Sequence, residues 1–331
     1  MKRKIICMLI VISMLSTIMI QTVYATSKTT AIDNIQLESL NSIGVTLDTA
    51  EKITPLYNAD DTVIAYCIEG EASFSIIDLN GMVVVHNSES NSPFFNLNKR
   101  IYINGPMGFY TKEGNAFIHV VNEKERLTAN DFNNNKIVTV QTNLKTAFSK
   151  ESENTASTRA ITSDYITKSL RNYEYNPSGI CMGTAGAILL AYYKDNVNSN
   201  IAAARHINAD GVGLTILLAE GSYYRYSGSA ASTAAQVLNW YMGLHGSTSY
   251  TASYTTSNIF STVKSKISAN RPLQAHFDDG DINHSVVIRG YRQDSSNSNN
   301  NYVYCNYGWG SAYSNMQVNA NHVYGVIWIN A

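Results

Sequence analysis

The stretch NPSGICMGTAGAILLAYY, Asn176 to Tyr193, decides the fold of the second half of the chain. From residue 185 its apolar residues recur at the i, i+3, i+4 and i+7 spacing of one helix face. The Asn-Pro-Ser-Gly run that opens it is typical of a turn, so we expect the helix to begin near Cys181. The small residues 183–187 lower helix propensity but let another backbone come close. The stretch therefore predicts a buried helix with a cysteine in its first turn.

The pattern that follows this helix changes from helical to extended. Two further helices are predicted, over ASTAAQVLNWYMGLHG (231–246) and SNIFSTVKSKISAN (257–270). After Arg271 the chain is rich in β-branched and aromatic residues, which predicts strands in PLQAHFD, HSVVIRGY, YVYCNYG and HVYGVIWIN. Helices followed by strands indicate an α+β fold with a C-terminal antiparallel sheet.

The first half predicts a separate, smaller β-rich region over about 45–125. Turn residues separate four short apolar segments, which are TVIAYCIEG, ASFSIIDL, GMVVVHN and AFIHVVN. A helix is predicted before them, over 32–44. After them, Lys145 to Tyr165 is polar and has no apolar period, which indicates an exposed linker. Its Lys150 and Arg159 are sites where proteases can cut.

The N-terminus has the three parts of a secretory signal peptide. A basic MKRK precedes the apolar run IICMLIVISMLSTIMI, and Val23 to Ala25 fits a cleavage site after Ala25. A membrane anchor is the alternative, but the run contains hydroxyl residues and is shorter than the ~20 residues of a spanning helix. We therefore expect export. The net charge of −1 and the pI of 6.6 argue against a nucleic-acid binder.

Three cysteines remain once Cys7 leaves with the signal peptide, and an odd number argues against a disulfide framework. Cys67 and Cys305 lie within apolar strands, where a buried thiol is a packing residue. Cys181 is either a packing residue or a nucleophile. The positive end of a helix dipole stabilises a thiolate, and a thiolate in catalysis needs a histidine with an oriented ring.

His284, which opens the segment HSVVIRGY, is the candidate histidine. If that strand pairs with YVYCNYG through the loop between them, Asn306 comes beside His284 and orients its ring. Trp309 would then shield the His–Asn hydrogen bond from water. His276 on the preceding strand is a weaker rival. The histidines show no paired metal-ligand spacing and the chain has no phosphate loop, so we expect no metal or organic cofactor.

Together, GICMGTAGAILLAYY, HSVVIRGY and CNYGWG resemble the papain-like cysteine peptidases, and more closely their bacterial streptopain-type branch. The resemblance implies a papain-like fold in which Cys181, His284 and Asn306 are catalytic. That family commonly has a glutamine about six residues before the cysteine as an oxyanion donor. Position 175 is a tyrosine in this chain, so the nearest amide, Asn176, is the candidate donor, and Trp309 is the shielding residue.

The resemblance also implies a zymogen layout. It consists of a signal peptide (1–25), a β-rich inhibitory propeptide (26–144), a linker with the processing site (145–164) and a cysteine peptidase domain (165–331). The expected protein is a secreted endopeptidase that acts on proteins or peptides, is inhibited by its own propeptide, and has no nucleic-acid partner and no stable membrane anchor. Two alternatives stay open. One is another secreted thiol enzyme, a cell-wall peptidase or acyltransferase, and the other is an inactive papain-like binding protein.

Overall fold

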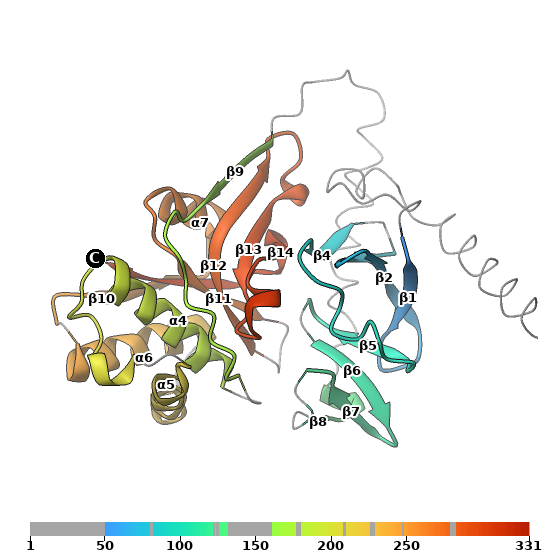
Figure 1. The fold of residues 1–331 in the computed structure, drawn as a ribbon, viewed down its shortest axis with the longest axis horizontal. Coiled ribbons are helices and arrows are strands. Elements are labelled where there is room, and N and C mark those ends of the chain that lie inside the picture. Colours follow the sequence, from blue (N-terminus) through green and yellow to red (C-terminus); the bar gives the residue numbers. More distant parts are fainter. Residues whose placement is uncertain are drawn as a thin grey trace, which may run out of the picture.

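The structure is a computed structural model (Figure 1). It describes residues 50–79, 82–106, 108–121, 123, 126–131, 161–176, 180–207, 210–225, 229–246, 248–278 and 283–330. The predicted signal peptide, the predicted helix over 32–44 and most of the predicted linker lie outside these residues. Among the described residues, no helix has the length and apolar character needed to cross a membrane.

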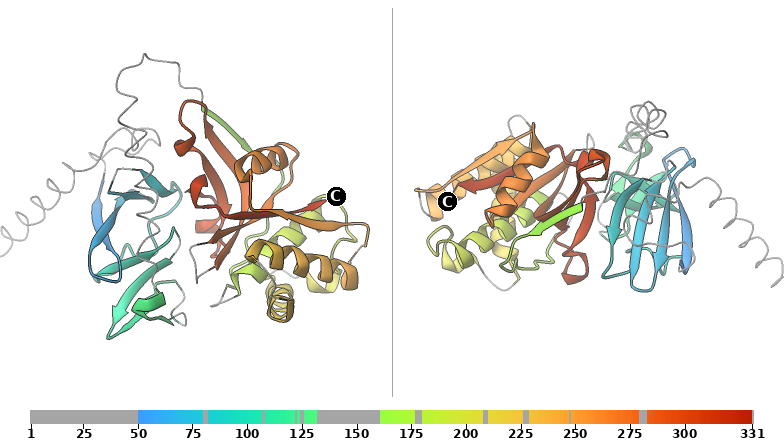
Figure 2. Two further views of the ribbon diagram at one scale, coloured as in Figure 1. Left: turned by 180° about the vertical axis from the view of Figure 1, so that it is seen from behind. Right: turned by 90° about the horizontal axis from the view of Figure 1, so that it is seen from above.

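The fold is α+β, as predicted, and is built on one large sheet that is mostly antiparallel. The helices lie on the side of the second region, away from the strands of the first (Figures 1 and 2). We call residues 50–131 the first region and residues 161–330 the second region.

The first region contains strands only, apart from one 3-10 turn, within its described residues. Its strands are β1 (Lys52–Tyr57), β2 (Val63–Gly70), β3 (Ser73–Asp78), β4 (Val83–Asn87), β5 (Ile101–Asn104), β6 (Gly108–Glu113), β7 (Ala116–His119) and β8 (Arg126–Leu127), and the turn is η2 (Ala129–Asp131). The four predicted segments are confirmed as β2, β3, β4 and β7. Neighbouring strands pair antiparallel except β1 and β5, which pair parallel.

The second region contains the helices α4 (Cys181–Asn196), α5 (Val212–Arg225), α6 (Ala230–His245) and α7 (Ile259–Ser268). Its strands are β9 (Ile161–Tyr165), β10 (Thr251–Thr255), β11 (Leu273–Asp278), β12 (Asn283–Asp294), β13 (Tyr302–Asn306), β14 (Met316–Asn319) and β15 (Gly325–Asn330). Its 3-10 turns are η3 (Ala204–His206), η4 (Ser298–Asn300), η5 (Ser311–Tyr313) and η6 (Ala320–His322). The three predicted helices and the four predicted strands are present.

Two elements of the second region differ from the prediction. α5 was not predicted, and its sequence carries glycines at 213 and 221 that weaken a helical pattern. β9 lies at the end of the segment predicted to be linker. It pairs with β12, from Gly290↔Tyr165 to Asp294↔Ile161, but four of its five residues are exposed. An exposed strand needs no apolar alternation, and this explains why its composition resembles a linker.

A single strand pair joins the sheets of the two regions. β4 runs antiparallel to β14, with Val85 opposite Val318 and His86 opposite Gln317. The loop after β4 strengthens this junction, because Asn87 Nδ2 donates to the carbonyl oxygen of Ala312 over 3.0 Å. The first region therefore supplies a strand to what would otherwise be an open sheet edge.

The helix α4 is buried on all sides from residue 183 to residue 193, so it forms the centre of the second region. A Cβ atom at Gly183 would lie 2.4 Å from the carbonyl oxygen of Thr215 in α5. The absence of a side chain at this position therefore sets how closely α4 and α5 approach. The small residues of the opening stretch serve helix–helix contact here, rather than contact with the sheet alone.

Gly183→Ala is expected to destabilise the protein by about 1–3 kcal/mol, because the added methyl group forces two backbones apart. Gly213→Ala in α5 is the matched control, since a Cβ atom there meets nothing within 4 Å. The control should be neutral or gain up to about 1 kcal/mol from helix propensity. Urea unfolding of both variants measures the difference, and equal stabilities would contradict the close contact.

Candidate active site

Cys181 is the first residue of α4 and is 8% exposed. The residue before it, Ile180, provides no side-chain cap, and its carbonyl oxygen accepts from the N–H of Thr184 over 3.0 Å. The sulfur therefore lies at the positive end of a 16-residue helix, where a thiolate is favoured. The cysteines at 67, 181 and 305 are all thiols.

The first turn of α4 is held against the sheet by a glutamine that the sequence did not single out. Gln274 on β11 is fully buried, and its Nε2 donates to the carbonyl oxygen of Met182 over 3.2 Å. Its Oε1 is buried and has no hydrogen-bond partner among the described residues. An amide in an apolar strand such as PLQAHFD is the sequence signal that points to this contact.

The pairing of β11, β12 and β13 determines which side chains face α4. Gln274 lies opposite Val287, and Val287 lies opposite Asn306. His276, which pairs with Ser285, lies two residues after Gln274 on β11, and side chains two residues apart point to the same face. Gln274, His276 and Asn306 therefore share the face of the sheet that meets α4. His284 pairs with Phe277 at the start of β12, one residue out of step with that set.

His284 packs its ring against Trp309, with the ring centroids 5.6 Å apart. Its Nε2 is buried and has no hydrogen-bond partner among the described residues. Burial, together with His119 and His276 nearby, lowers the pKa of His284 to about 3. The imidazole is therefore neutral at neutral pH in this arrangement.

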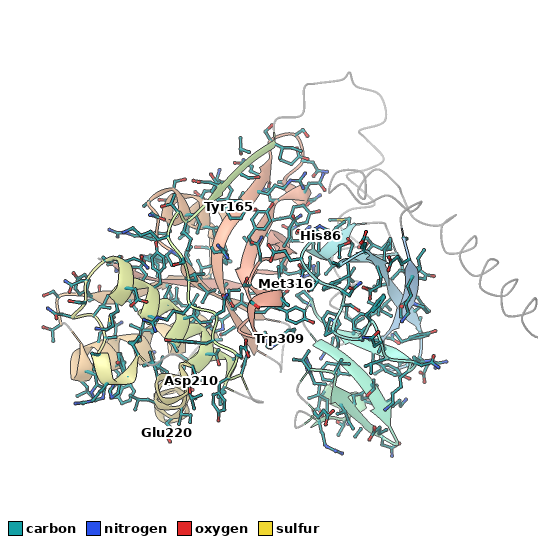
Figure 3. All side chains as sticks on the ribbon, viewed as in Figure 1. His86, Tyr165, Asp210, Glu220, Trp309 and Met316 are labelled. Carbon is teal, nitrogen blue, oxygen red and sulfur yellow. The ribbon has the colours of Figure 1, made fainter. Side chains whose placement is uncertain are left out.

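His119 of the first region reaches the same tryptophan. It ends β7, is almost fully buried, and lies 5.7 Å from the Trp309 ring centroid to centroid. Trp309 thus contacts one histidine from each region (its position is labelled in Figure 3). The sequence prediction missed His119, because the contact joins segments almost 200 residues apart.

Asn306 is held by two hydrogen bonds within the second region. Its Nδ2 donates to Asn172 Oδ1 and its Oδ1 accepts from the N–H of Gly308, both over 2.9 Å. Among the described residues no hydrogen bond joins Asn306 to His284. The predicted orienting contact is therefore not made in this arrangement, and a catalytic role for Asn306 stays a prediction.

Asn176 lies where the Asn-x-x-Trp loop meets α4. Its Nδ2 donates to the carbonyl oxygen of Tyr307 over 3.4 Å. Gly308, at φ +70°, packs beside the first turn of the helix, where an added Cβ atom would lie 2.9 Å from Thr184 Cγ2. The structure thus brings the start of α4, Asn176 and this loop together.

The rival histidine, His276, is buried on the α4 face. Its Nδ1 and the hydroxyl of Ser285 are 2.8 Å apart, and burial lowers its pKa to about 3. The two other thiols are in surroundings that disfavour a thiolate, since burial raises the pKa of both Cys67 and Cys305 well above the ordinary value. No group of three His, Cys, Asp or Glu that could hold a metal ion occurs within the described ranges.

A comparison with protein-family models identifies a family for the second region. A family model described as Peptidase_C39 like family matches residues 161–331, which is slightly more than half of the chain. The match begins at β9 and covers the whole second region, including α4 and the strands that carry the candidate histidines. None of the curated proteins compared with the chain matches it.

Proposed function

The chain belongs to the Peptidase_C39-like family, a cysteine peptidase family, and on that premise we propose that it is a secreted cysteine endopeptidase made as a zymogen. One observation carries the proposal. Cys181 stands at the start of the buried helix α4, and the loop Tyr307–Trp309 packs on that same turn. The streptopain-type resemblance of the three motifs supports this reading, as does the predicted signal peptide.

In the proposed reaction the sulfur of Cys181 attacks the scissile carbonyl carbon and forms a carbon–sulfur bond. His284 takes the thiol proton and gives it to the leaving amine as the peptide bond breaks. Water then cleaves the acyl-enzyme with the same histidine as base. Asn306 orients His284, and Asn176 with the backbone N–H of Cys181 donates to the oxyanion.

The first region is the proposed inhibitor. His119 makes an edge contact with Trp309, which also contacts His284, and the β4–β14 pair fixes the region that carries His119. With the first region in place, His284 Nε2 has no hydrogen-bond partner in the described part of the chain, and Asn306 Oδ1 accepts from the N–H of Gly308. We assign this arrangement to the latent state. Removal of the first region would free Trp309 and let the imidazole of His284 turn toward Asn306.

A thiol-directed epoxide tests the nucleophile directly. After cleavage of the 145–164 linker, the epoxide should modify Cys181 and leave Cys305 unmodified, because the Cys305 thiol is fully buried and its pKa is raised. Mass spectrometry of tryptic peptides identifies the modified residue. Modification of Cys305 at the same rate, or none at Cys181, would contradict the proposal.

The same reagent tests latency. In the uncut chain Cys181 should react more slowly than in the cut chain, because the proposed inhibitor keeps His119 packed against Trp309. His119→Ala in the uncut chain should recover part of that rate, because it uncovers Trp309. Equal rates before and after the cut would leave Cys181 as the nucleophile but remove the inhibitory role of the first region.

A further inference from the structure

A polar cavity of about 320 Å³ lies at the junction of the two regions, apart from the candidate active site. Side chains from both regions line it, among them His86, Ser88, Tyr165, Arg292, Tyr304 and Gln317. Its position follows from the sheet, because His86 and Gln317 are register partners across β4 and β14. Figure 3 labels His86 and Tyr165 at this junction.

The charge around the cavity is mainly positive. Burial lowers the pKa of His86 to about 4, and Arg292 acts in the same direction, so the imidazole is neutral beside a guanidinium. Arg289 is also close enough to act on Tyr165, and its Nε is buried with no hydrogen-bond partner among the described residues. The carboxylate of Glu89 opposes these positive charges, since it accepts from Asn315 and also acts on Tyr165. These charges favour an anion.

Two amide side chains of the lining have unmet hydrogen bonds. Gln317 is 6% exposed, and its Nε2 is buried without a partner in the described part of the chain. Asn315, which also lines the cavity, donates Nδ2 to Glu89 Oε1 over 3.2 Å. This bond fixes the amide so that Oδ1 is the atom left buried and unpaired. A buried polar atom without a partner costs about 1–3 kcal/mol, so a ligand that accepts from Gln317 and donates to Asn315 would remove both costs.

We infer that the junction cavity binds inorganic phosphate. Its oxygens accept from the Arg292 guanidinium and from Gln317 Nε2, and its P–OH donates to Asn315 Oδ1. Inorganic phosphate keeps a P–OH group at neutral pH, whereas sulfate has none and a phosphate monoester is mostly doubly charged. Since the ligating groups come from both regions, bound phosphate holds them together. That consequence for latency rests on the proposed function, but the binding does not.

The test uses the full chain carrying Cys181→Ala, so that the two regions stay connected. Phosphate is titrated at constant ionic strength, and both the melting temperature and the heat of binding are measured. We expect a saturable rise in Tm for this chain. Arg292→Gln and Gln317→Leu should each raise the Kd for phosphate about tenfold or more, as expected for the loss of a charge-assisted hydrogen bond. Arg205→Gln, in the exposed turn η3, is the matched control and should leave the Kd unchanged.

Sulfate and glycerol 3-phosphate complete the experiment. Weaker binding of both supports a free phosphate whose hydroxyl pairs with Asn315. If sulfate binds with the same Kd as phosphate, the role of the hydroxyl is overturned. If glycerol 3-phosphate binds with the same Kd, the assignment to free phosphate is overturned. A Tm rise that is equal in wild-type and Arg292→Gln chains, or absent in both, overturns the site. None of these outcomes depends on peptidase activity, so they are independent of the proposed function.

Discussion

Cys181→Ala is expected to lower kcat/KM for peptide hydrolysis by about 10⁴-fold or more, to the level that binding and the oxyanion donors alone sustain. In the proposed reaction the sulfur of Cys181 forms the only covalent bond between the enzyme and its substrate. Alanine at the first position of α4 keeps the helix, because it removes one atom and is a strong helix former. The measurement is hydrolysis of casein or a fluorogenic peptide by the processed enzyme.

The control for that loss is Cys305→Ala, which also removes one buried sulfur from the second region. It should cost stability but retain most of kcat/KM, because Cys305 lies inside β13 and its side chain alternates with that of Asn306. Hydrolysis by Cys181→Ala at the wild-type rate would show that another residue is the nucleophile.

The same hydrolysis assay distinguishes the roles of His276 on β11 and His284 on β12. His284→Ala should lose as much activity as Cys181→Ala, and the double variant should lose little more, because the two residues act as a unit. His276→Ala should retain kcat and lose stability, since it leaves a cavity and removes the hydrogen bond between Nδ1 and the Ser285 hydroxyl. The reverse result would assign the proton transfer to His276, which already faces α4.

Much of the second region was predictable because its signals are local. The start of α4 at Cys181 is encoded in the turn residues before it and in the apolar period after it. The hairpin of β12 and β13 follows from two apolar segments around a loop rich in asparagine and serine. Such signals define elements but not how their side chains are aligned.

The alignment of His284 with Asn306 shows what the local pattern leaves open. A register shift between Ile288 and Gly290 sets Asn306 opposite Val287, and a shift of one residue moves a side chain to the other face. Whether the strands bring His284 and Asn306 together is therefore decided by a bulge that the sequence pattern does not reveal. The contact of His119 with Trp309 could not be predicted from the sequence either, because it depends on how two separate regions pack.

Acidification from pH 6.5 to pH 4 is expected to destabilise the intact chain by several kcal/mol. Burial lowers the pKa to about 3 for His276 and His284 and to about 4 for His86 and His322. Unfolded histidines have a pKa of about 6.5, so between pH 6.5 and 4 the unfolded chain binds protons that the folded chain does not. Stability therefore falls as pH falls, by about 1.4 kcal/mol per pH unit for each buried histidine.

His276 gives the clearest single contribution, because it is 1% exposed. Over this window it should account for about 3 kcal/mol of the loss, and His276→Gln should remove that part of the slope. Gln274→Met, on the same strand and face, is the control. The unfolding free energy that this substitution removes should not vary with pH, because neither side chain titrates. Urea unfolding at pH 6.5, 5.5 and 4.5 measures the three slopes. Identical slopes for the wild-type and His276→Gln chains would mean that His276 is not kept neutral by burial.

His86 adds a local effect, because its protonation places a second positive charge beside Arg292 at the β4–β14 junction. The junction should therefore open at a higher pH than the core of the second region, and the first region should leave Trp309 before the peptidase fold is lost.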